Sequence, residues 1–449
     1  MNQQQYRIEK DAFGEVRIPA DRLWGPTTQR CLENFDISEE KMPREIIRAF
    51  AVLKRAAALT NARLGGLDQK RAFAIAAVCD RIFEGGYAEE FPLPVWQTGS
   101  GAQTDMNVNE VISHLTGLHP DDINRGQSSN DTFPTAMHIA FVMMTESDLL
   151  PAISLLRSTF SSLAGDYREV IKVGRTHLMD ATPLTLGQEI SAWVEMLDVC
   201  AYLIESVLEP VRELALGGTI VGTGYNSHPD FGEVAAHVIS KYTGFDFRAA
   251  PNKFHAISSM DTASGLHGAL NTLATDLIKI ANDIRWLASG PRCGIGELII
   301  PANEPGSTAM PGKVNPSQCE ALTMAAARVI GNDVAVGFGS SQGNFQLNTY
   351  LPVIAYSVIQ SIRLLADAIR SFNDRCAIGI RPNLAFIAYY LNQALMLVAA
   401  LTPRIGYERA AEITKYAYET GFSLRDAIVG RGILSNAEFD RLVDPKNMI

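Results

Sequence analysis

The sequence predicts a mainly α-helical protein with an elongated central helical bundle and small N- and C-terminal domains. Over several long stretches, apolar residues recur at steps of three and four, which is typical of amphipathic helices. Between Leu266 and Leu287 these steps alternate as a heptad seam, a pattern that indicates helices packed lengthwise. The β-prone segments near the N-terminus are short by comparison.

The N-terminal part is expected to hold a small arm followed by two helices. Tyr6–Ile8 and Val16–Pro19 are short β-prone pieces, which indicate a hairpin or an irregular arm. Helical periodicity then covers Arg44–Leu64, and a second helix is expected near Arg71–Glu84. We assign residues 1–134 to an N-terminal domain.

The middle of the chain, residues 135–373, is expected to form an up-and-down bundle of five long helices with loops that carry chemistry at its ends. The first helical pattern starts at Thr135, and the others cover Glu189–Leu214, Leu266–Leu287, Cys319–Val336 and Tyr350–Phe372. Such a bundle exposes wide apolar stripes, which favour self-association. Shorter helical patterns over Leu384–Leu401 and Tyr407–Thr420 indicate a small C-terminal domain over residues 374–449.

Composition narrows the function classes. A formal net charge of −10 and a pI of about 5.4 disfavour non-specific binding to nucleic acid or to an anionic membrane. The six cysteines are widely spaced without a CxxC pair, which argues against zinc ligation and against a disulfide framework. The N-terminus lacks the apolar core of a signal peptide, and no uninterrupted apolar run reaches the ~18 to 20 residues of a membrane span. We therefore expect a cytoplasmic protein.

The segment Pro301–Glu320 is rich in proline and glycine and separates two helical stretches, so it is expected to be a long loop. Loops of this length inside a compact chain are often lids or binding loops. Hydroxyl, ammonium and amide groups on Ser307, Thr308, Lys313 and Asn315 could together bind an anion. The alternative interpretation is a solvated turn.

Three other polar segments are candidates for the same site. Ser100 lies between two glycines that leave backbone amides open to a ligand, although a simple linker has the same composition. Ser128, Ser129 and Asn130 directly precede a predicted helix, where backbone N–H groups favour a carboxylate, although ordinary capping would need only one of them. His177 is a lone histidine next to a turn, where one helix is expected to end and another to begin, and such residues are usually structural.

Three segments carry a resemblance to a known family. GSTAMPGKVNPSQCEA, which starts at Gly306, resembles the signature loop of the fumarase/aspartase superfamily. Gly312 and the Gln318–Glu320 continuation are more similar to class II fumarases than to aspartases. QSSNDTFPTAMHIA and GRTHLMDATPLTLGQE resemble the second and third family regions, and the resemblance covers nearly the whole chain.

The resemblance implies reversible hydration of fumarate to (S)-malate through an aci-carboxylate intermediate, without a metal or an organic cofactor. Ser307 matches the family's base, and Lys313 and Asn315 match positions that stabilise the charged intermediate. His177 matches the proton-donor side, oriented by Glu320. Substrate contacts are implied for Ser100, Ser128, Ser129, Asn130, Thr176 and Thr308. Family architecture and the heptad seam together indicate a homotetramer whose active sites are shared between subunits.

The chain also departs from the family pattern. Ala102 stands where the family has a threonine, which removes a hydroxyl expected to bond a substrate carboxylate. Asp105 replaces an asparagine and is either an added negative charge or a solvated residue before a helix. The family's second dicarboxylate site appears here only as His119, Asp121 and Asp122, in a segment shorter than that of most class II fumarases.

Two alternatives to a fumarase remain at this point. One is a related lyase or hydratase acting on a substituted fumarate or on aspartate, which a substrate panel would distinguish. The other is a non-catalytic structural protein on the same fold, as lens crystallins are on a related one. Retention of Ser307, His177, Lys313 and Glu320 together argues against a structural protein.

Overall fold

The computed structural model describes residues 5–449, in which the chain divides into two compact units. Unit 1 comprises the residues up to Pro151 together with Cys200–Thr275 and Ala325–Ala366. Unit 2 comprises Ala152–Val199, Asp276–Met324 and Asp367–Ile449. Helices dominate both units, so the predicted fold class is confirmed. The three domains 1–134, 135–373 and 374–449 remain a prediction.

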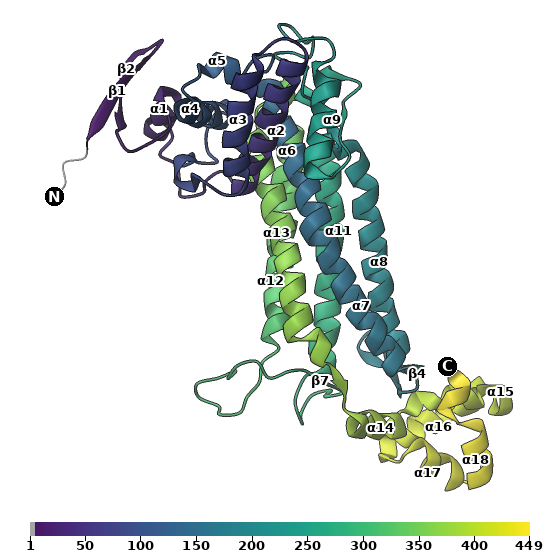
Figure 1. Ribbon diagram of the computed structural model, residues 1–449. Coiled ribbons are helices and arrows are strands. Elements are labelled where there is room, and N and C mark those ends of the chain that lie inside the picture. Colours follow the sequence, from purple (N-terminus) through teal and green to yellow (C-terminus); the bar gives the residue numbers. More distant parts are fainter. Residues whose placement is uncertain (1–4) are drawn as a thin grey trace. The chain divides into compact units, whose positions relative to one another are not determined.

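Unit 1 begins with an antiparallel hairpin, β1 (Tyr6–Asp11) and β2 (Gly14–Pro19), in which Tyr6 pairs with Pro19 (Figure 1). Its further elements, in chain order, are α1 (Pro26–Asn34), α2 (Arg44–Arg63), α3 (Gln69–Phe83), α4 (Ala102–Thr116), α5 (Pro120–Ile123), α6 (Ser129–Met144), a π-helical turn (Thr145–Leu149), β5 (Glu213–Leu214), α9 (Phe231–Thr243), β6 (Arg248–Ala249), α10 (Lys253–Ser258), β8 (Gly343–Asn344) and β9 (Leu347–Asn348). The arm and the two helices predicted for this part are confirmed.

The core of unit 1 forms around α2, whose apolar residues are spaced so that one broad face is buried. Phe50 of α2 meets Phe133 of α6 edge to face, with 5.8 Å between the ring centroids. Because α6 begins only a few residues before Phe133, this packing fixes the N-terminal end of α6 against α2.

Unit 2 contains α7 (Leu150–Asp166) apart from its first two residues, and an antiparallel hairpin of β3 (Ile171–Thr176) and β4 (Met179–Thr185). Its later elements are β7 (Leu298–Ile299), β10 (Arg381–Pro382), α14 (Leu384–Gln393), a 3₁₀ helix (Leu395–Leu401), α15 (Thr402–Ile405), α16 (Tyr407–Thr420), α17 (Leu424–Val429) and α18 (Asn436–Leu442). Helices α14 to α18 lie together near the C-terminus (Figure 1). Val173 of β3 joins their apolar core, together with Leu401, Ile413 and Phe439.

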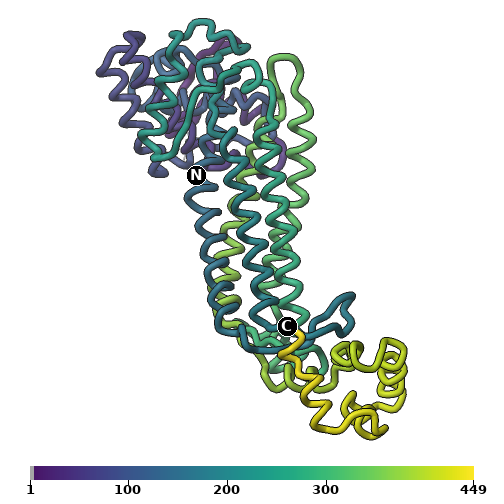
Figure 2. Tube along the Cα trace, turned by 90° about the vertical axis from the view of Figure 1, so that its right-hand side faces the viewer, coloured from purple at the N-terminus to yellow at the C-terminus, as the bar shows by residue number. Residues whose placement is uncertain are grey.

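Four long helices contribute residues to both units, and their bounds are α8 (Leu186–Val211), α11 (Asp261–Leu287), α12 (Ser317–Ser340) and α13 (Leu351–Arg375). Within unit 1, α12 and α13 run side by side and are joined by the β8–β9 hairpin (Figure 2). Asn332 of α12 donates hydrogen bonds to Gln360 and Ser361 of α13. The heptad seam on α11 is buried as predicted, since Leu266, Leu270 and Leu277 are fully covered.

The structure bears on the expectations for disulfides and for membrane-spanning segments. None of the six cysteines, all of which lie in the described part of the chain, forms a disulfide. By length and composition alone, however, the helical stretches Ser129–Asp166, Ser317–Ser340 and Leu351–Gly379 could cross a membrane. Counting only uninterrupted apolar runs was therefore too strict a criterion. The apolar windows of these stretches are 56%, 28% and 61% buried inside the protein.

Candidate functional site

Ser100 and Ala102 lie in unit 1 where a tight turn leads into α4. The turn depends on Gly101, which adopts a φ of 70° at the N-cap of the helix. A Cβ added to Gly101 would lie 2.1 Å from the Phe133 ring of α6, so no larger residue fits there. This close approach sets the Ser100 turn directly against the helix that begins at Ser129.

Ser128, Ser129 and Asn130 form the first turn of α6, also in unit 1. A capping box holds them, because the Ser128 side chain accepts from the Asn130 N–H at 3.3 Å and the Asp131 carboxylate accepts from the Ser128 N–H at 2.9 Å. The Asn130 amide donates to the Ile220 carbonyl at 2.8 Å. The N-terminus of α6 therefore combines hydroxyl, amide and backbone donors in one place, as an anion site requires.

Asp131 ties this helix start to a strained loop. Its Oδ2 accepts from the backbone N–H groups of Gly217 and Thr219, each at 2.9 Å. Thr219 has a φ of 54°, a left-handed conformation that a β-branched residue adopts only when its surroundings enforce it. Burial raises the pKa of the Asp131 carboxyl to about 6, although the three N–H donors act in the opposite direction.

Asp105 is not the solvated residue that the sequence allowed. It lies in the first turn of α4, its exposed fraction is 1%, and its Oδ1 is 2.8 Å from the Lys54 Nζ in a buried ion pair. The negative charge at this position is therefore balanced by Lys54 of α2. Ala102, at the start of the same helix, is half-buried.

Thr176 and His177 belong to unit 2, at the tip of the β3–β4 hairpin rather than between two helices as the sequence indicated. His177 and Leu178 form the turn with φ values of 57° and 62°, the geometry of a two-residue hairpin that normally takes asparagine or glycine. Thr176, His177 and Leu178 are all exposed. Gly174 lies inside β3 and Pro183 inside β4, and both residue types weaken a strand pattern, which is why the strands were missed.

A buried charge network anchors the hairpin below its tip. Arg175 of β3 forms a two-pronged ion pair with Glu297, whose side chain is fully buried. Lys172 Nζ lies 3.1 Å from Glu189 and 3.3 Å from Glu297. Burial raises the pKa of Glu189 against the effect of Lys172. These contacts fix the stem of the hairpin while its tip projects outward.

The signature loop of unit 2 closes on itself. The Gly306 N–H donates to the Lys313 carbonyl at 2.8 Å, and the Asn315 side-chain amide donates to the Gly306 carbonyl at 2.7 Å. A Cβ on Gly306 would come within 2.6 Å of the Lys313 carbonyl oxygen, so glycine is required for this closure. The long loop predicted here is confirmed by the irregular backbone between β7 and α12.

Ser307 sits inside the closed loop with its oxygen facing two backbone donors. Its Oγ accepts from the Ala309 N–H at 3.2 Å and from the Met310 N–H at 3.1 Å. Such donors stabilise a negative oxygen more than a neutral hydroxyl. Thr308, the next residue, is exposed. The arrangement suits a serine that must lose its proton.

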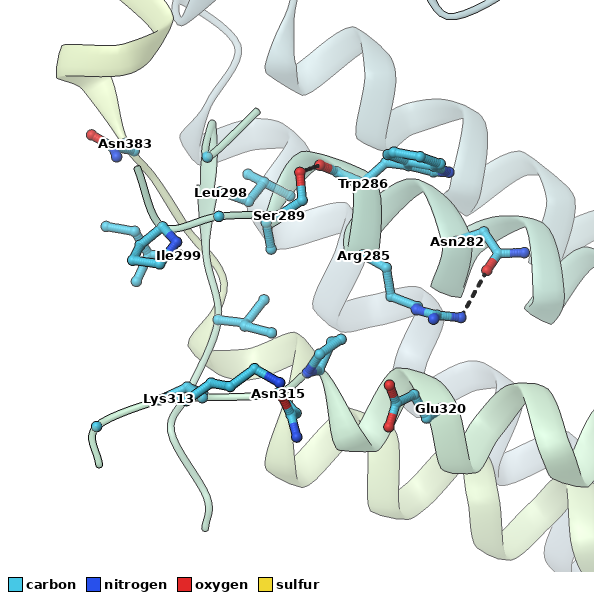
Figure 3. Close-up of a pocket in the computed structure, with 18 residues that line it drawn as sticks. Asn282, Arg285, Trp286, Ser289, Leu298, Ile299, Lys313, Asn315, Glu320 and Asn383 are labelled. Atoms are coloured by element: carbon cyan, nitrogen blue, oxygen red, sulfur yellow. Dashed lines mark hydrogen bonds between the residues drawn. The ribbon is translucent and has the colours of Figure 1, made fainter. Parts of the chain in front are cut away.

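Lys313, Asn315 and Glu320 line a cavity of about 840 Å³ within unit 2 (Figure 3). Arg285 of α11 lines it too, and among the described residues the only hydrogen bond of its side chain is to the Asn282 side chain at 3.3 Å. In the part of the chain that the structure describes, Lys313, Arg285 and Glu320 form no ion pair. Arg285 and Asn282 were missed from the sequence because they occupy polar positions of the heptad helix, which resemble an ordinary solvated face.

The structure brings the predicted residues together in two groups. Unit 1 holds Ser100, Ala102, Ser128, Ser129 and Asn130, and unit 2 holds Ser307, Thr308, Lys313, Asn315 and Glu320 together with the separate hairpin tip that carries Thr176 and His177. No hydrogen bond or ion pair joins His177 to Glu320 within residues 5–449. Over the same residues, no cluster of three or more His, Cys, Asp or Glu side chains could hold a metal ion.

The segment predicted as a second dicarboxylate site is occupied by local contacts. His119 caps the short helix α5, with its Nδ1 accepting from the Asp121 N–H at 3.3 Å. Asp122 pairs with Arg71 at 2.9 Å. Arg71 is thus engaged by a carboxylate of this segment, which leaves less positive charge for a second dianion. A role for His119, Asp121 and Asp122 in binding stays a prediction.

Comparison with known proteins places this geometry in a family. Residues 14–331 match the Lyase family, and residues 397–449 match the Fumarase C C-terminus family. A fumarate hydratase class II from Bacillus subtilis (strain 168) is 54% identical over 457 residues, covering 99% of each chain. The crystal structure of a class II fumarase from Schistosoma mansoni superposes with a TM-score of 0.96 at 38% identity, covering 99% of each chain. A fumarate lyase:delta crystallin from Brucella melitensis gives a TM-score of 0.94 at 36% identity, again over 99% of both chains. The chain therefore belongs to the lyase family and, within it, to the class II fumarate hydratases.

Proposed function

We propose that this protein is a fumarate hydratase, which adds water reversibly across the double bond of fumarate to give (S)-malate. Full-length similarity to a fumarate hydratase class II carries the assignment. The site supports it, because Lys313, Asn315 and Glu320 line one cavity and Ser307 lies in the loop that carries Lys313 and Asn315. These groups are the donors, cation and carboxylate that acid/base chemistry on a dicarboxylate needs.

In the direction from malate, Ser307 removes the C3 proton. The electrons left on carbon flow into the adjacent carboxylate, which becomes a doubly charged aci-carboxylate. Lys313 and Asn315 stabilise this species more than they stabilise the substrate, and that difference lowers the barrier. The two backbone N–H groups on the Ser307 oxygen favour its ionised form and so make the hydroxyl a competent base.

His177 serves the other half of the reaction. It protonates the departing hydroxyl at C2 so that water leaves, with Glu320 orienting its imidazole. Since no hydrogen bond or ion pair joins His177 to Glu320 within residues 5–449, we infer that the pair forms between copies of the chain. We infer a homotetramer with active sites shared between subunits. The exposed apolar residues Met324, Val334 and Phe338 on α12 give such an assembly a surface to bury.

The carboxylates of the substrate are bound by the donors gathered in unit 1. Ser100, Ser128, Ser129 and Asn130 supply hydroxyl, amide and helix N-terminal N–H groups. Thr176 and Thr308 add hydroxyls from unit 2. The enzyme uses no metal or organic cofactor in this scheme, and we place it in the cytoplasm as a soluble enzyme of the tricarboxylic acid cycle.

A second candidate function follows from Ala102. The half-buried methyl group at the start of α4 provides no hydroxyl to the site and leaves more room than a threonine would. That observation favours a hydratase that also accepts a fumarate with a methyl group on the double bond.

The test is the absorbance of the substrate double bond, followed after adding malate, aspartate or methyl-substituted analogues to the purified protein. We expect absorbance to rise with malate as fumarate forms. Activity on aspartate alone would identify an ammonia-lyase instead, and activity on none of the substrates would overturn the assignment to this reaction class.

A further inference from the structure

The ion pair between Lys54 and Asp105 is almost completely buried in unit 1. The exposed fractions of the two side chains are 0% and 1%, and their charged atoms are 2.8 Å apart. Removing two charges from water costs about as much as their attraction returns, so a buried pair is poor evidence for stabilisation alone. Its position in unit 1 suggests another role.

Lys54 connects the two polar segments of unit 1. Its Nζ donates to Asn124 Oδ1 at 2.9 Å and to Gln127 Oε1 at 3.0 Å, and Gln127 directly precedes Ser128. On its other side, Asp105 lies in the first turn of α4, three residues after Ala102. The ammonium group of Lys54 on α2 thus contacts both the first turn of α4 and the segment that leads into α6.

Further hydrogen bonds join α4 to the Ser100 turn and to the segment before α6. The Asp105 N–H donates to the Gly101 carbonyl at 3.3 Å, within the turn that carries Ser100. Asn109 of α4 donates to Asn124 Oδ1 at 3.4 Å, a second link across the same gap. A displacement at Lys54 would therefore reach both groups of carboxylate donors.

We propose that the Lys54–Asp105 pair is a positioning device that fixes the spacing between the Ser100 turn and the Ser128–Asn130 turn, and thereby sets the affinity for the dicarboxylate. Lys54 also cancels the charge of Asp105, which would otherwise repel a dianion bound by these turns. The effect on affinity rests on the function proposed above. Lys54 and Asp105 touch no reacting atom and act only through the donors that they place.

The main test is the double variant Lys54→Met/Asp105→Leu. It removes both buried charges together and fills the space with apolar groups, so the fold is expected to persist. We expect KM for malate to rise about tenfold or more because the donors of the two turns lose their fixed spacing. We expect kcat to change less than about threefold. A purely structural pair would instead lower the melting temperature and leave KM of the folded enzyme unchanged.

Arg55→Met provides the matched control. Arg55 is the next residue on α2, and its Nε is 2.8 Å from Asp80 Oδ1 in an ion pair of the same length. That pair is partly exposed and none of its hydrogen bonds reaches either polar turn. We expect KM and kcat of this variant within about twofold of the parent. An equal rise of KM in both variants, or wild-type KM in the double variant, would overturn the proposal.

Hydrogen exchange measured by mass spectrometry gives a readout that does not depend on the reaction. Backbone amides of residues 98–105 and 124–131 should exchange faster in the double variant than in the parent, and should not change in Arg55→Met. Should the parent act on no dicarboxylate, the proposed function fails, whereas unchanged exchange at both segments contradicts the positioning role itself.

Discussion

The polar turn at the start of α6 and the hairpin tip that carries His177 differ in how they are held. Ser128–Asn130 is fixed from three sides, by its capping box, by Asp131 on the Gly217–Thr219 amides and by Ile220. His177 is exposed at the end of a two-residue turn whose stem alone is anchored. The groups that we propose to bind carboxylates are thus preorganised within one chain, whereas the histidine that we propose as proton donor would obtain its surroundings from another copy of the chain.

The largest expected effect is the loss of the proton-transfer groups. Ser307→Ala and His177→Asn should each lower kcat by at least ~10²-fold, since a positioned acid or base contributes about that much. Initial rates with malate, measured by absorbance, provide the check.

The control for the Ser307→Ala and His177→Asn variants is His255→Asn in unit 1. His255 is also exposed and bonds Asp261 at 2.9 Å, but it belongs to neither predicted group. Its variant should keep parental turnover. Near-normal turnover in both the Ser307 and His177 variants would remove these residues from the reaction.

A smaller effect, on the affinity for malate, is expected from a change at Ala102 in the preorganised region. Ala102→Thr adds a hydroxyl to the first turn of α4, and a hydrogen bond to a charged group is worth about 1.5 to 3 kcal/mol. If the hydroxyl reaches a substrate carboxylate, affinity for malate should rise roughly ten- to a hundredfold.

The same variant separates the two candidate substrates. Assays with malate and with a methyl-substituted analogue should show a gain on malate if a contact was missing, or a selective loss on the analogue if the pocket is enlarged. Unchanged constants for both would mean that Ala102 does not face the ligand.

The last effect concerns stability and not catalysis, and it is the dependence of the free energy of unfolding on pH through Asp131. Its pKa is about 6 in the folded protein against 3.8 for an ordinary aspartate, so the folded state holds the proton more tightly. Its contribution to stability is full below pH ~3.8 and is lost as pH rises through ~6, a change of roughly 3 kcal/mol. The charge of Asp105 also acts to raise the pKa of Asp131, and the charge of Asp131 in turn acts to raise the pKa of Lys253. Both neighbours are present in the parent and in the variant.

The measurement compares urea unfolding of the parent and of Asp131→Asn between pH 4 and pH 7. The parent should lose more free energy of unfolding over this range than the variant, which has no titrating group at this position. Parallel curves would show that Asp131 does not titrate in this window.

The sequence predicted the long helices well because their apolar spacing is regular over many turns. Arg44–Leu64 and Tyr407–Thr420 were predicted to within one residue of the observed helices. The first long helical pattern was placed from Thr135, whereas the observed α6 begins six residues earlier, at Ser129, and contains Pro134. Pro134 is the sixth residue of α6, beyond the first four N–H groups that lack a partner within a helix, so the helix accommodates it at the cost of one backbone hydrogen bond.

The site was predicted only in part, and for a physical reason. Motifs indicated Ser307, Lys313 and Asn315 because these residues are close in sequence and their loop closes on itself. Lys54, which pairs with Asp105, and Arg285, which lines the cavity, come from helices distant in sequence, where each looks like one more surface cation. Pairings that arise only from tertiary packing leave no local pattern.

The shared active site is the central claim, and mixing inactive subunits tests it most directly. Ser307→Ala and His177→Asn proteins are combined, allowed to exchange subunits, and assayed with malate after hybrid oligomers have been isolated. Because some sites in a hybrid would hold both the wild-type loop and the wild-type hairpin tip, activity should return to a substantial fraction of the parental value. Hybrids that are shown to form but remain as inactive as either variant would contradict a site built from more than one chain.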